Sequence, residues 1–230
     1  MPKAASVVQE HVTFDGAIGQ IEAILTYPEQ NDPQESIFIV GPHPMLGGDF
    51  DNNVIRELST CLAERNTLTL RFNYRGVGQS DGEPILSTDN IAEFWARSRI
   101  DQESGFAEDT FAAGQFLADT FGKVSHVVGY SFGAWLGSRW AADATDVASV
   151  SLVAPTINQH NYSHCRQLSM PKFVVASADD FAVPTDQLRH QFDQWSNPKQ
   201  LVIENVDNHF FRGHEHWLAN MISTFQRGDS

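Results

Sequence analysis

Ser131 stands at the centre of the segment GYSFG (129–133), which follows an apolar run and precedes a stretch rich in helix formers. A glycine two positions to either side of a serine removes the Cβ atoms that would clash in a sharp strand-to-helix turn. Such a turn holds the serine hydroxyl out at the end of a strand. A phosphate-binding loop would carry a lysine here, and this segment has none. The pattern therefore predicts a nucleophilic serine.

A serine hydroxyl is a weak nucleophile until a base removes its proton, and His209 is the predicted base. His209 follows the apolar stretch 199–206, so it falls after a strand, as Ser131 does. An acid that orients the imidazole should lie between the two in the chain. Asp179 and Asp180 both follow the apolar stretch 172–178, and either carboxylate would serve. Asp207, beside His209, is interpreted as a turn residue.

Acyl transfer also requires two backbone N–H groups that stabilise an oxyanion. One is predicted to be the N–H of Phe132, the residue after the nucleophile. The other should come from the loop GPHPMLGGDFDN (41–52), where Pro44 has no N–H to donate. Met45 is the first choice for the second donor and Leu46 the second. His43 is expected to brace this loop.

Strands and helices alternate over most of the chain and are expected to position these residues. Two early strands, near 9–15 and 18–27, flank the hairpin signal Asp15-Gly16. Later strands are expected near 36–40, 67–76, 124–130, 147–155, 172–178 and 199–206. Helices are expected near 51–66, 89–98, 107–121, 132–142, 185–195 and 214–226. The later strands are continuously apolar, which favours a mostly parallel sheet covered by helices on both faces. The carboxyl ends of such strands share one edge, where ligands bind.

Composition narrows the function classes further. The 230 residues carry a net charge of −14, which argues against nucleic acid and anionic membrane surfaces as partners. No stretch is long and apolar enough for a membrane span, and the N-terminus does not resemble a signal peptide. Two cysteines, Cys61 and Cys165, are too few for a disulfide framework. We therefore expect a cytoplasmic protein.

Three segments resemble the small bacterial α/β-hydrolases, a group of predicted serine hydrolases related to dienelactone hydrolases and small esterases. They are GPHPMLGGDFDNNVI, LTLRFNYRGVGQSDGE and VVGYSFGA. The resemblance implies an α/β-hydrolase fold in a single domain over residues 1–230, and it favours Asp180 over Asp179 as the acid. Segment 84–106 is longer and more aromatic than the family minimum. Segments 84–106 and 156–170 are therefore expected to form a minimal or partial lid. A homodimer is expected by analogy with the fold.

The prediction is a serine hydrolase that acts on an ester or thioester of a small or medium apolar acyl group through an acyl-enzyme. Side chains expected to line the substrate pocket are His43, Tyr130, Trp95, Phe181 and Phe210. No metal or organic cofactor is expected, because this mechanism requires none. The motif His214-Glu215-His216 is not interpreted as a metal site, since residues two apart do not share a helix face. Three alternatives stay open. One is an acyltransferase, cyclase or C–C hydrolase that uses the same residues, another is a cofactor-free perhydrolase, and the third is a non-catalytic binding or scaffold protein.

Overall fold

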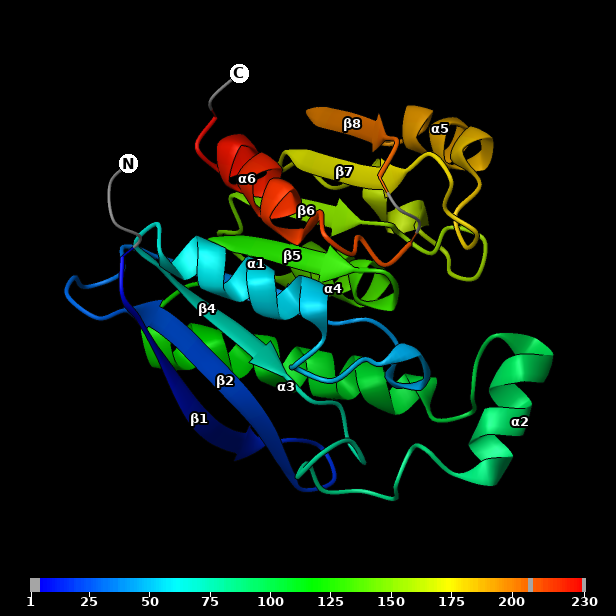
Figure 1. Ribbon diagram of the computed structural model, residues 1–230, viewed down its shortest axis with the longest axis horizontal. Coiled ribbons are helices and arrows are strands. Elements are labelled where there is room, and N and C mark those ends of the chain that lie inside the picture. The colour runs from blue at the N-terminus through cyan, green and yellow to red at the C-terminus, as the bar shows by residue number, and fades with distance from the viewer. Residues whose placement is uncertain (1–4, 207–208, 229–230) are drawn as a thin grey trace.

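The computed structural model describes residues 5–206 and 209–228, and within them an eight-stranded sheet runs in the order β1-β2-β4-β3-β5-β6-β7-β8 (Figure 1). The strands are β1 (Val7–Asp15), β2 (Gln20–Pro28), β3 (Glu35–Val40), β4 (Thr67–Phe72), β5 (His126–Tyr130), β6 (Ser149–Val153), β7 (Lys172–Ser177) and β8 (Lys199–Glu204). Strand β2 pairs antiparallel with β1 and with β4, and every other pairing is parallel. The predicted mostly parallel sheet is confirmed.

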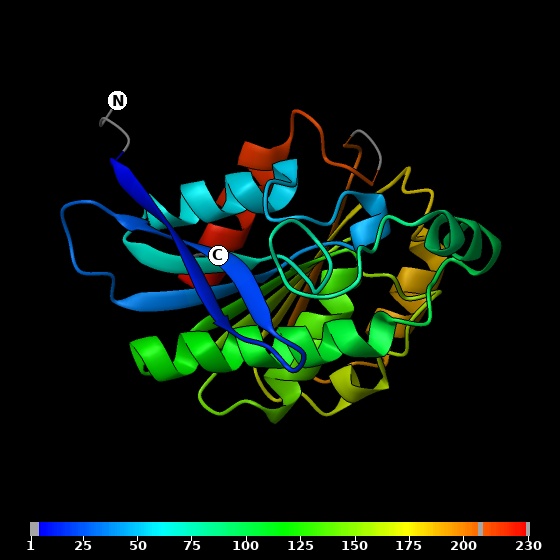
Figure 2. The ribbon, with the colours of Figure 1, turned by 90° about the horizontal axis from the view of Figure 1, so that it is seen from below.

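Helices cover both faces of the sheet, as Figure 2 shows in side view. The helices are α1 (Asn53–Ala63), α2 (Thr88–Arg97), α3 (Glu103–Phe121), α4 (Phe132–Asp143), α5 (Thr185–Asp193) and α6 (Glu215–Gln226), with short 3₁₀ turns at η1 (Pro44–Leu46) and η2 (Ser163–Arg166). Apolar side chains of α1 and α6 pack in one buried cluster with alternate residues of β3, β5, β6 and β7. Those of α3, α4 and α5 pack in a second cluster with the opposite residues of the same strands. Each central strand is therefore buried on both faces, which explains its continuous apolar run.

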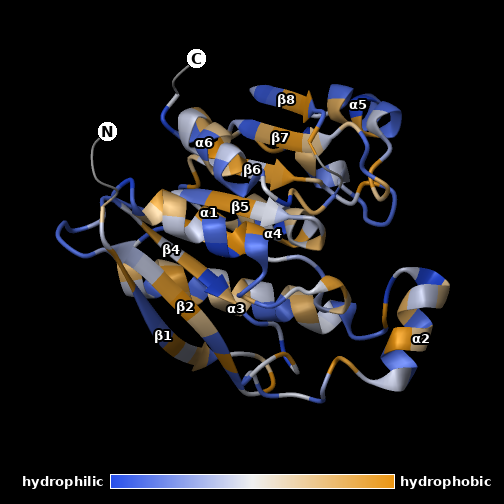
Figure 3. Cartoon of the chain, viewed as in Figure 1, coloured by the Kyte–Doolittle hydropathy of each residue, from blue (hydrophilic) through white to orange (hydrophobic). Residues whose placement is uncertain are grey.

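Hydropathy follows the same layering. Figure 3 shows hydrophobic residues concentrated along the central strands, whereas the helices and loops carry a mixture of hydrophobic and hydrophilic residues. Sheet and helices thus bury two apolar layers, one on each side of the sheet. Burial of apolar surface at about 25 cal/mol per Å² is the dominant favourable term in such an arrangement.

Element boundaries differ from the predicted ones where backbone groups find other partners. Strand β4 ends at Phe72 instead of near residue 76, because Gly76 donates its N–H to the carbonyl of Asp81 (3.1 Å) within a turn. Asn52, rather than Asp51, lies at the start of α1, where its side chain accepts the N–H of Val54 (3.1 Å).

Helix α2 lies beyond the carboxyl ends of the strands and stands apart from the sheet (Figure 1). It matches the short helix that the sequence predicted near 89–98, and the side chain of Ser87 accepts the N–H of Asn90 (3.2 Å) at its start. Helix α3 begins at Glu103, four residues before the predicted start at 107. Within the described residues, no helix is both long and apolar enough to cross a membrane.

Candidate active site

Ser131 occupies the sharp turn between β5 and α4, in a backbone conformation (φ 57°, ψ −118°) that non-glycine residues rarely adopt. Its N–H donates to the carbonyl of Val153 on the neighbouring strand (2.8 Å). The flanking glycines allow the turn. A Cβ at Gly133 would lie 2.1 Å from the carbonyl oxygen of Val40, and one at Gly129 would lie 2.4 Å from that of Gly133. The spacing of GYSFG is thus explained by close backbone packing.

The imidazole of His209 lies between Ser131 and Asp180. Its Nε2 is 2.9 Å from the hydroxyl oxygen of Ser131, although 78 positions separate the two residues. Its Nδ1 is 2.8 Å and 3.0 Å from the two carboxylate oxygens of Asp180. Because a carboxylate can only accept, we assign the proton to Nδ1, which leaves Nε2 free to accept from the serine hydroxyl. All three side chains are buried.

The structure also distinguishes Asp179 from Asp180, the two carboxylates that residue type and position alone made equally suitable as the acid. Asp180 is buried, and its Oδ1 accepts the backbone N–H groups of Ala182 (2.8 Å) and Val183 (3.2 Å). Asp179 is exposed and makes a backbone contact to the hydroxyl of Ser177 (3.3 Å). Asp207 lies outside the described residues. Asp180 is therefore the carboxylate that contacts the imidazole of His209.

The predicted oxyanion donors differ in their present partners. Phe132 is the first residue of α4, a position whose N–H has no acceptor within a helix. The N–H of Met45 donates to Nδ1 of His43 (3.1 Å), and that of Leu46 donates to the carbonyl of His43 (2.8 Å). His43 therefore braces the loop as expected. Both predicted second donors are engaged within that loop.

Ser131 and His209 open onto a cavity of about 270 Å³ that is mainly apolar. Four of the five side chains predicted for the pocket line it: His43, Trp95, Phe181 and Phe210. Trp95 and Phe181 are 77% and 66% exposed, so they form its mouth. A larger hollow of about 940 Å³ lies beyond the loop, where Met45 contributes to its wall. It contains none of Ser131, Asp180 and His209.

The prediction that Tyr130 lines the pocket is wrong. Its ring is buried in the cluster under α1 and α6, because alternate residues of a strand point to opposite faces. The hydroxyl of Tyr130 donates to the backbone carbonyl of His209 (2.9 Å) and so holds the loop that carries the imidazole. Burial raises the pKa of Tyr130 well above its ordinary value, which keeps the hydroxyl protonated as a donor.

Both segments that the sequence assigned to a lid contribute to the walls of this cavity. Phe94, Trp95 and Ser98 come from segment 84–106, on and just after α2. Thr156, Gln159 and His160 come from segment 156–170. The cavity thus lies between the carboxyl ends of the strands and segments 84–106 and 156–170.

A partly buried polar cluster that joins His43 and His160, in the wall of the cavity, to Glu103 was not predicted. The carboxylate of Glu103 lies 3.5 Å from Nε2 of His43 and 3.7 Å from Nε2 of His160. His160 is held in turn by a 2.8 Å contact between its Nδ1 and the hydroxyl of Thr156. Burial raises the pKa of Glu103, but the two imidazoles outweigh it and bring that pKa down to about 2. No sequence motif joins these residues, because each comes from a different loop or helix start.

Comparisons with known proteins identify chains that are related to this one. Residues 42–229 match the model of the alpha/beta hydrolase family. An alpha-beta serine hydrolase homologue from Coxiella burnetii is 29% identical, with a TM-score of 0.77 over 93% of this chain and 95% of that one. An uncharacterized protein of Rickettsia prowazekii is 26% identical over 212 residues, which are 87% of this chain and 82% of that protein.

A more distant structure shares the fold alone. The dienelactone hydrolase of Anabaena variabilis is 15% identical, with a TM-score of 0.72 over 94% of this chain and 95% of that one. The family match, by contrast, covers most of the chain and includes the segments that hold Ser131, Asp180 and His209. The chain therefore belongs to the alpha/beta hydrolase family and is an enzyme of the α/β serine hydrolase type.

Proposed function

We propose that the protein hydrolyses a carboxylic ester or thioester through an acyl-enzyme formed on Ser131. The observation that supports this most directly is the continuous hydrogen-bonded series from Asp180 to His209 to Ser131, with 2.8 Å and 2.9 Å links on the two sides of one imidazole. A base within hydrogen-bond reach of the serine, itself oriented by a third group, is the arrangement that activates a weak hydroxyl nucleophile.

In the first half-reaction, Nε2 of His209 takes the proton of Ser131 while the serine oxygen attacks the substrate carbonyl carbon. The bond from that carbon to the leaving oxygen or sulfur then breaks, and the leaving group takes the proton from Nε2. In the second half-reaction, water gives a proton to Nε2 and attacks the acyl carbon. The bond to Ser131 breaks, and the serine oxygen recovers the proton. Asp180 stabilises the imidazolium at both stages.

The oxyanion formed in each half-reaction is proposed to accept the N–H groups of Phe132 and Met45. The N–H of Phe132 lies at the start of α4, where the helix dipole also favours negative charge. The N–H of Met45 must leave Nδ1 of His43, its present acceptor, when the oxyanion forms. Loss of one such donor costs on the order of 3 kcal/mol in the barrier.

The size and lining of the cavity support a small or medium apolar acyl group. Its volume of about 270 Å³ is slightly below the range of about 300–1,000 Å³ typical of pockets for drug-sized ligands. Phe132, Phe181 and Phe210 line it with aromatic rings. Such aromatic walls favour an alkyl or aryl group over a charged one, because a charge placed against them would lose its hydration.

Labelling with a fluorophosphonate probe tests the nucleophile. The wild-type protein should gain one probe mass and lose the leaving fluoride, whereas Ser131→Ala should stay unlabelled. Ser163→Ala, an exposed serine on η2, serves as the control and should label as the wild type does. Labelling of Ser131→Ala would refute the proposed nucleophile.

Hydrolysis of p-nitrophenyl esters of graded chain length tests the substrate class. We expect a maximum of kcat/KM at short or medium acyl chains. Labelling at Ser131 without hydrolysis of any ester or thioester would instead favour an acyltransferase, a cyclase or a C–C hydrolase. Absence of both labelling and hydrolysis would favour a non-catalytic binding or scaffold role.

A further inference from the structure

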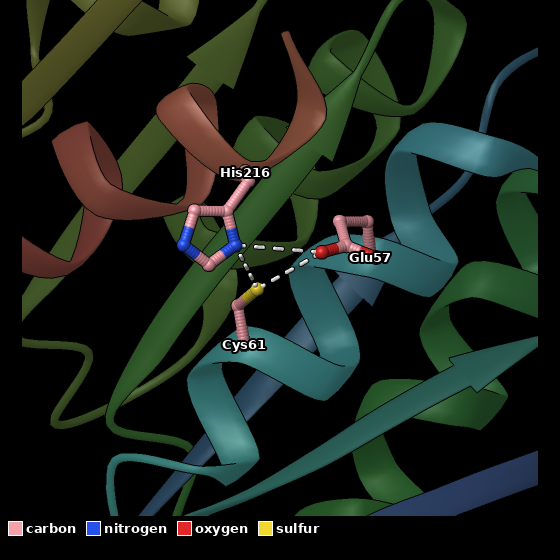
Figure 4. Close-up of side chains that lie close together, drawn as sticks. All are labelled: Glu57, Cys61 and His216. Carbon is pink, nitrogen blue, oxygen red and sulfur yellow. Dashed lines mark hydrogen bonds and ion pairs between the residues drawn. The ribbon is translucent and has the colours of Figure 1, made fainter. Parts of the chain in front are cut away.

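A second cluster of reactive side chains lies on the opposite face of the sheet from α4, where α1 packs beside α6. It consists of Glu57 and Cys61 on α1 and His216 in the first turn of α6 (Figure 4). Figure 4 shows the three side chains pointing toward one another, with one carboxylate oxygen, the sulfur and one ring nitrogen at the centre. None of the three lines the cavity that contains Ser131.

The three donor atoms are spaced as the ligands of one small metal ion would be. The sulfur of Cys61 lies 3.3 Å from Oε1 of Glu57 and 3.2 Å from Nδ1 of His216, and the latter two atoms are 3.5 Å apart. Zinc binds sulfur at about 2.3 Å and nitrogen or oxygen at about 2.0–2.2 Å. At tetrahedral angles these lengths put ligand atoms about 3.4–3.6 Å apart. Each observed separation is therefore within about 0.4 Å of the expected one.

We propose that Glu57, Cys61 and His216 bind a single Zn²⁺ ion that links α1 to α6. A thiolate, an imidazole and a carboxylate form a ligand set that suits zinc better than calcium or magnesium, which prefer oxygen ligands. The side chain of His216 is 67% exposed, so solvent can reach the cluster and supply a water as the fourth ligand. No local pattern in the chain indicates this site, since Cys61 and His216 are 155 positions apart.

Binding exchanges a proton for the metal. In the metal-free protein the Cys61 thiol donates its proton to Oε1 of Glu57 (3.3 Å). Zinc displaces that proton to solvent and forms the Zn–S bond, while the nitrogen and oxygen ligands donate their lone pairs. No redox change is involved, and affinity should rise with pH because protons compete for the ligands.

Polar contacts already join the two helices beside this cluster. Asn53, the first residue of α1, donates from its side chain to Glu215 at the start of α6 (2.7 Å) and to the carbonyl of Phe210 (3.3 Å). Arg65, just after α1, contacts Asn220 of α6 at the other end of the interface between the two helices. A metal bound between these contacts would fix the start of α6, the helix that follows the loop bearing His209. We therefore assign the ion a role in the stability of the fold and not in the reaction at Ser131.

Cobalt substitution of the full-length, chelator-treated protein tests the site. One equivalent of Co²⁺ at mildly alkaline pH should produce a sulfur-to-cobalt charge-transfer band and the visible bands of four-coordinate cobalt, and Zn²⁺ should abolish both. Cys61→Ala should lose the charge-transfer band, whereas Cys165→Ala, the other buried cysteine, should retain it. His216→Ala should weaken binding at least tenfold, and His214→Ala should leave it unchanged.

Thermal unfolding provides a second readout that does not depend on catalysis. Zn²⁺ at a hundredfold excess over its Kd should raise the Tm of the wild type by about 5 °C or more, and should not raise that of His216→Ala. The side chain of His216 is mostly exposed, so this variant tests the site even where Cys61→Ala fails to fold. Absence of the cobalt band in the wild type, or its survival in both Cys61→Ala and His216→Ala, would overturn the proposal. Neither result bears on Ser131.

Discussion

The hydroxyl of Tyr130 donates a 2.9 Å hydrogen bond to the backbone carbonyl of His209. The residue that precedes the proposed nucleophile therefore holds the loop that carries the proposed base. Their rings also lie against each other, with centroids 5.7 Å apart. This contact couples two segments that are 79 positions apart in the chain.

Tyr130→Phe should therefore reduce activity while the fold persists. The substitution leaves a buried carbonyl without its donor, at a cost of about 1–3 kcal/mol, and lets the His209 loop shift. We expect kcat to fall about tenfold or more with little change in KM, because the imidazole loses its alignment with Ser131. Steady-state kinetics on the best ester, together with a chemical denaturation curve, would check this. An unchanged kcat would show that the loop is positioned by other contacts.

Asp180→Asn should lower kcat by about 10³–10⁴-fold. The amide oxygen can still accept the N–H groups of Ala182 and Val183, which turns the amide NH₂ toward Nδ1 of His209. That contact favours the proton on Nε2, so the ring can no longer accept from Ser131. Asp179→Asn, one residue away and exposed, is the matched control and should retain wild-type kcat. Equal losses in both variants would contradict the assignment of Asp180 as the acid.

Glu103→Gln should destabilise the protein by an amount that depends on pH. The folded-state pKa of Glu103 is about 2, below its ordinary value of 4.5, so its ionised form contributes stability above about pH 4.5. That contribution is lost as pH falls toward 2. We expect a loss of about 1–3 kcal/mol in unfolding free energy near pH 7 and a smaller loss near pH 3.

Urea denaturation of the wild type and of Glu103→Gln across pH 3–7 would measure how their difference in unfolding free energy depends on pH. Glu108→Gln, on the same helix, is the control because its side chain is 58% exposed and its carboxylate pairs with Arg75 (2.9 Å) rather than with a buried imidazole. It should change the unfolding free energy by no more than about 1 kcal/mol. If Glu103→Gln lost the same unfolding free energy at every pH, the ionised carboxylate could not be the source of that stability.

Removal of aromatic side chains at the mouth of the cavity should alter acyl-chain preference more than turnover. Trp95→Ala and Phe181→Ala each remove apolar surface that a longer acyl chain would contact. We expect kcat/KM to fall about three- to tenfold for medium-chain esters and to change little for acetate esters. Leu86→Ala, 69% exposed and outside this cavity, should leave the chain-length profile unchanged. If these variants lowered kcat/KM equally for all acyl chain lengths, the acyl group would not bind against Trp95 and Phe181.

Local patterns along the chain were enough to predict the order of elements and the turn at Ser131. Apolar runs bounded by glycine and proline marked the buried strands, and the glycines at 129 and 133 marked the sharp turn. These signals are local, because backbone sterics and strand burial act on neighbouring residues. Strand order along the sheet could not be obtained in this way, and neither could the exact starts of α1 and α3, which depend on caps and distant partners.

Contacts between distant segments could not be predicted, because they arise from the packing of the folded chain. Asp179 and Asp180 differ by one position in the chain, yet only Asp180 turns inward to His209. Tyr130 points away from the cavity because strand pleating places its side chain on the opposite face. Likewise His216 meets Cys61 only because α1 and α6 pack on the same face of the sheet. Such pairings depend on how the layers stack, and no local pattern in the sequence carries that information.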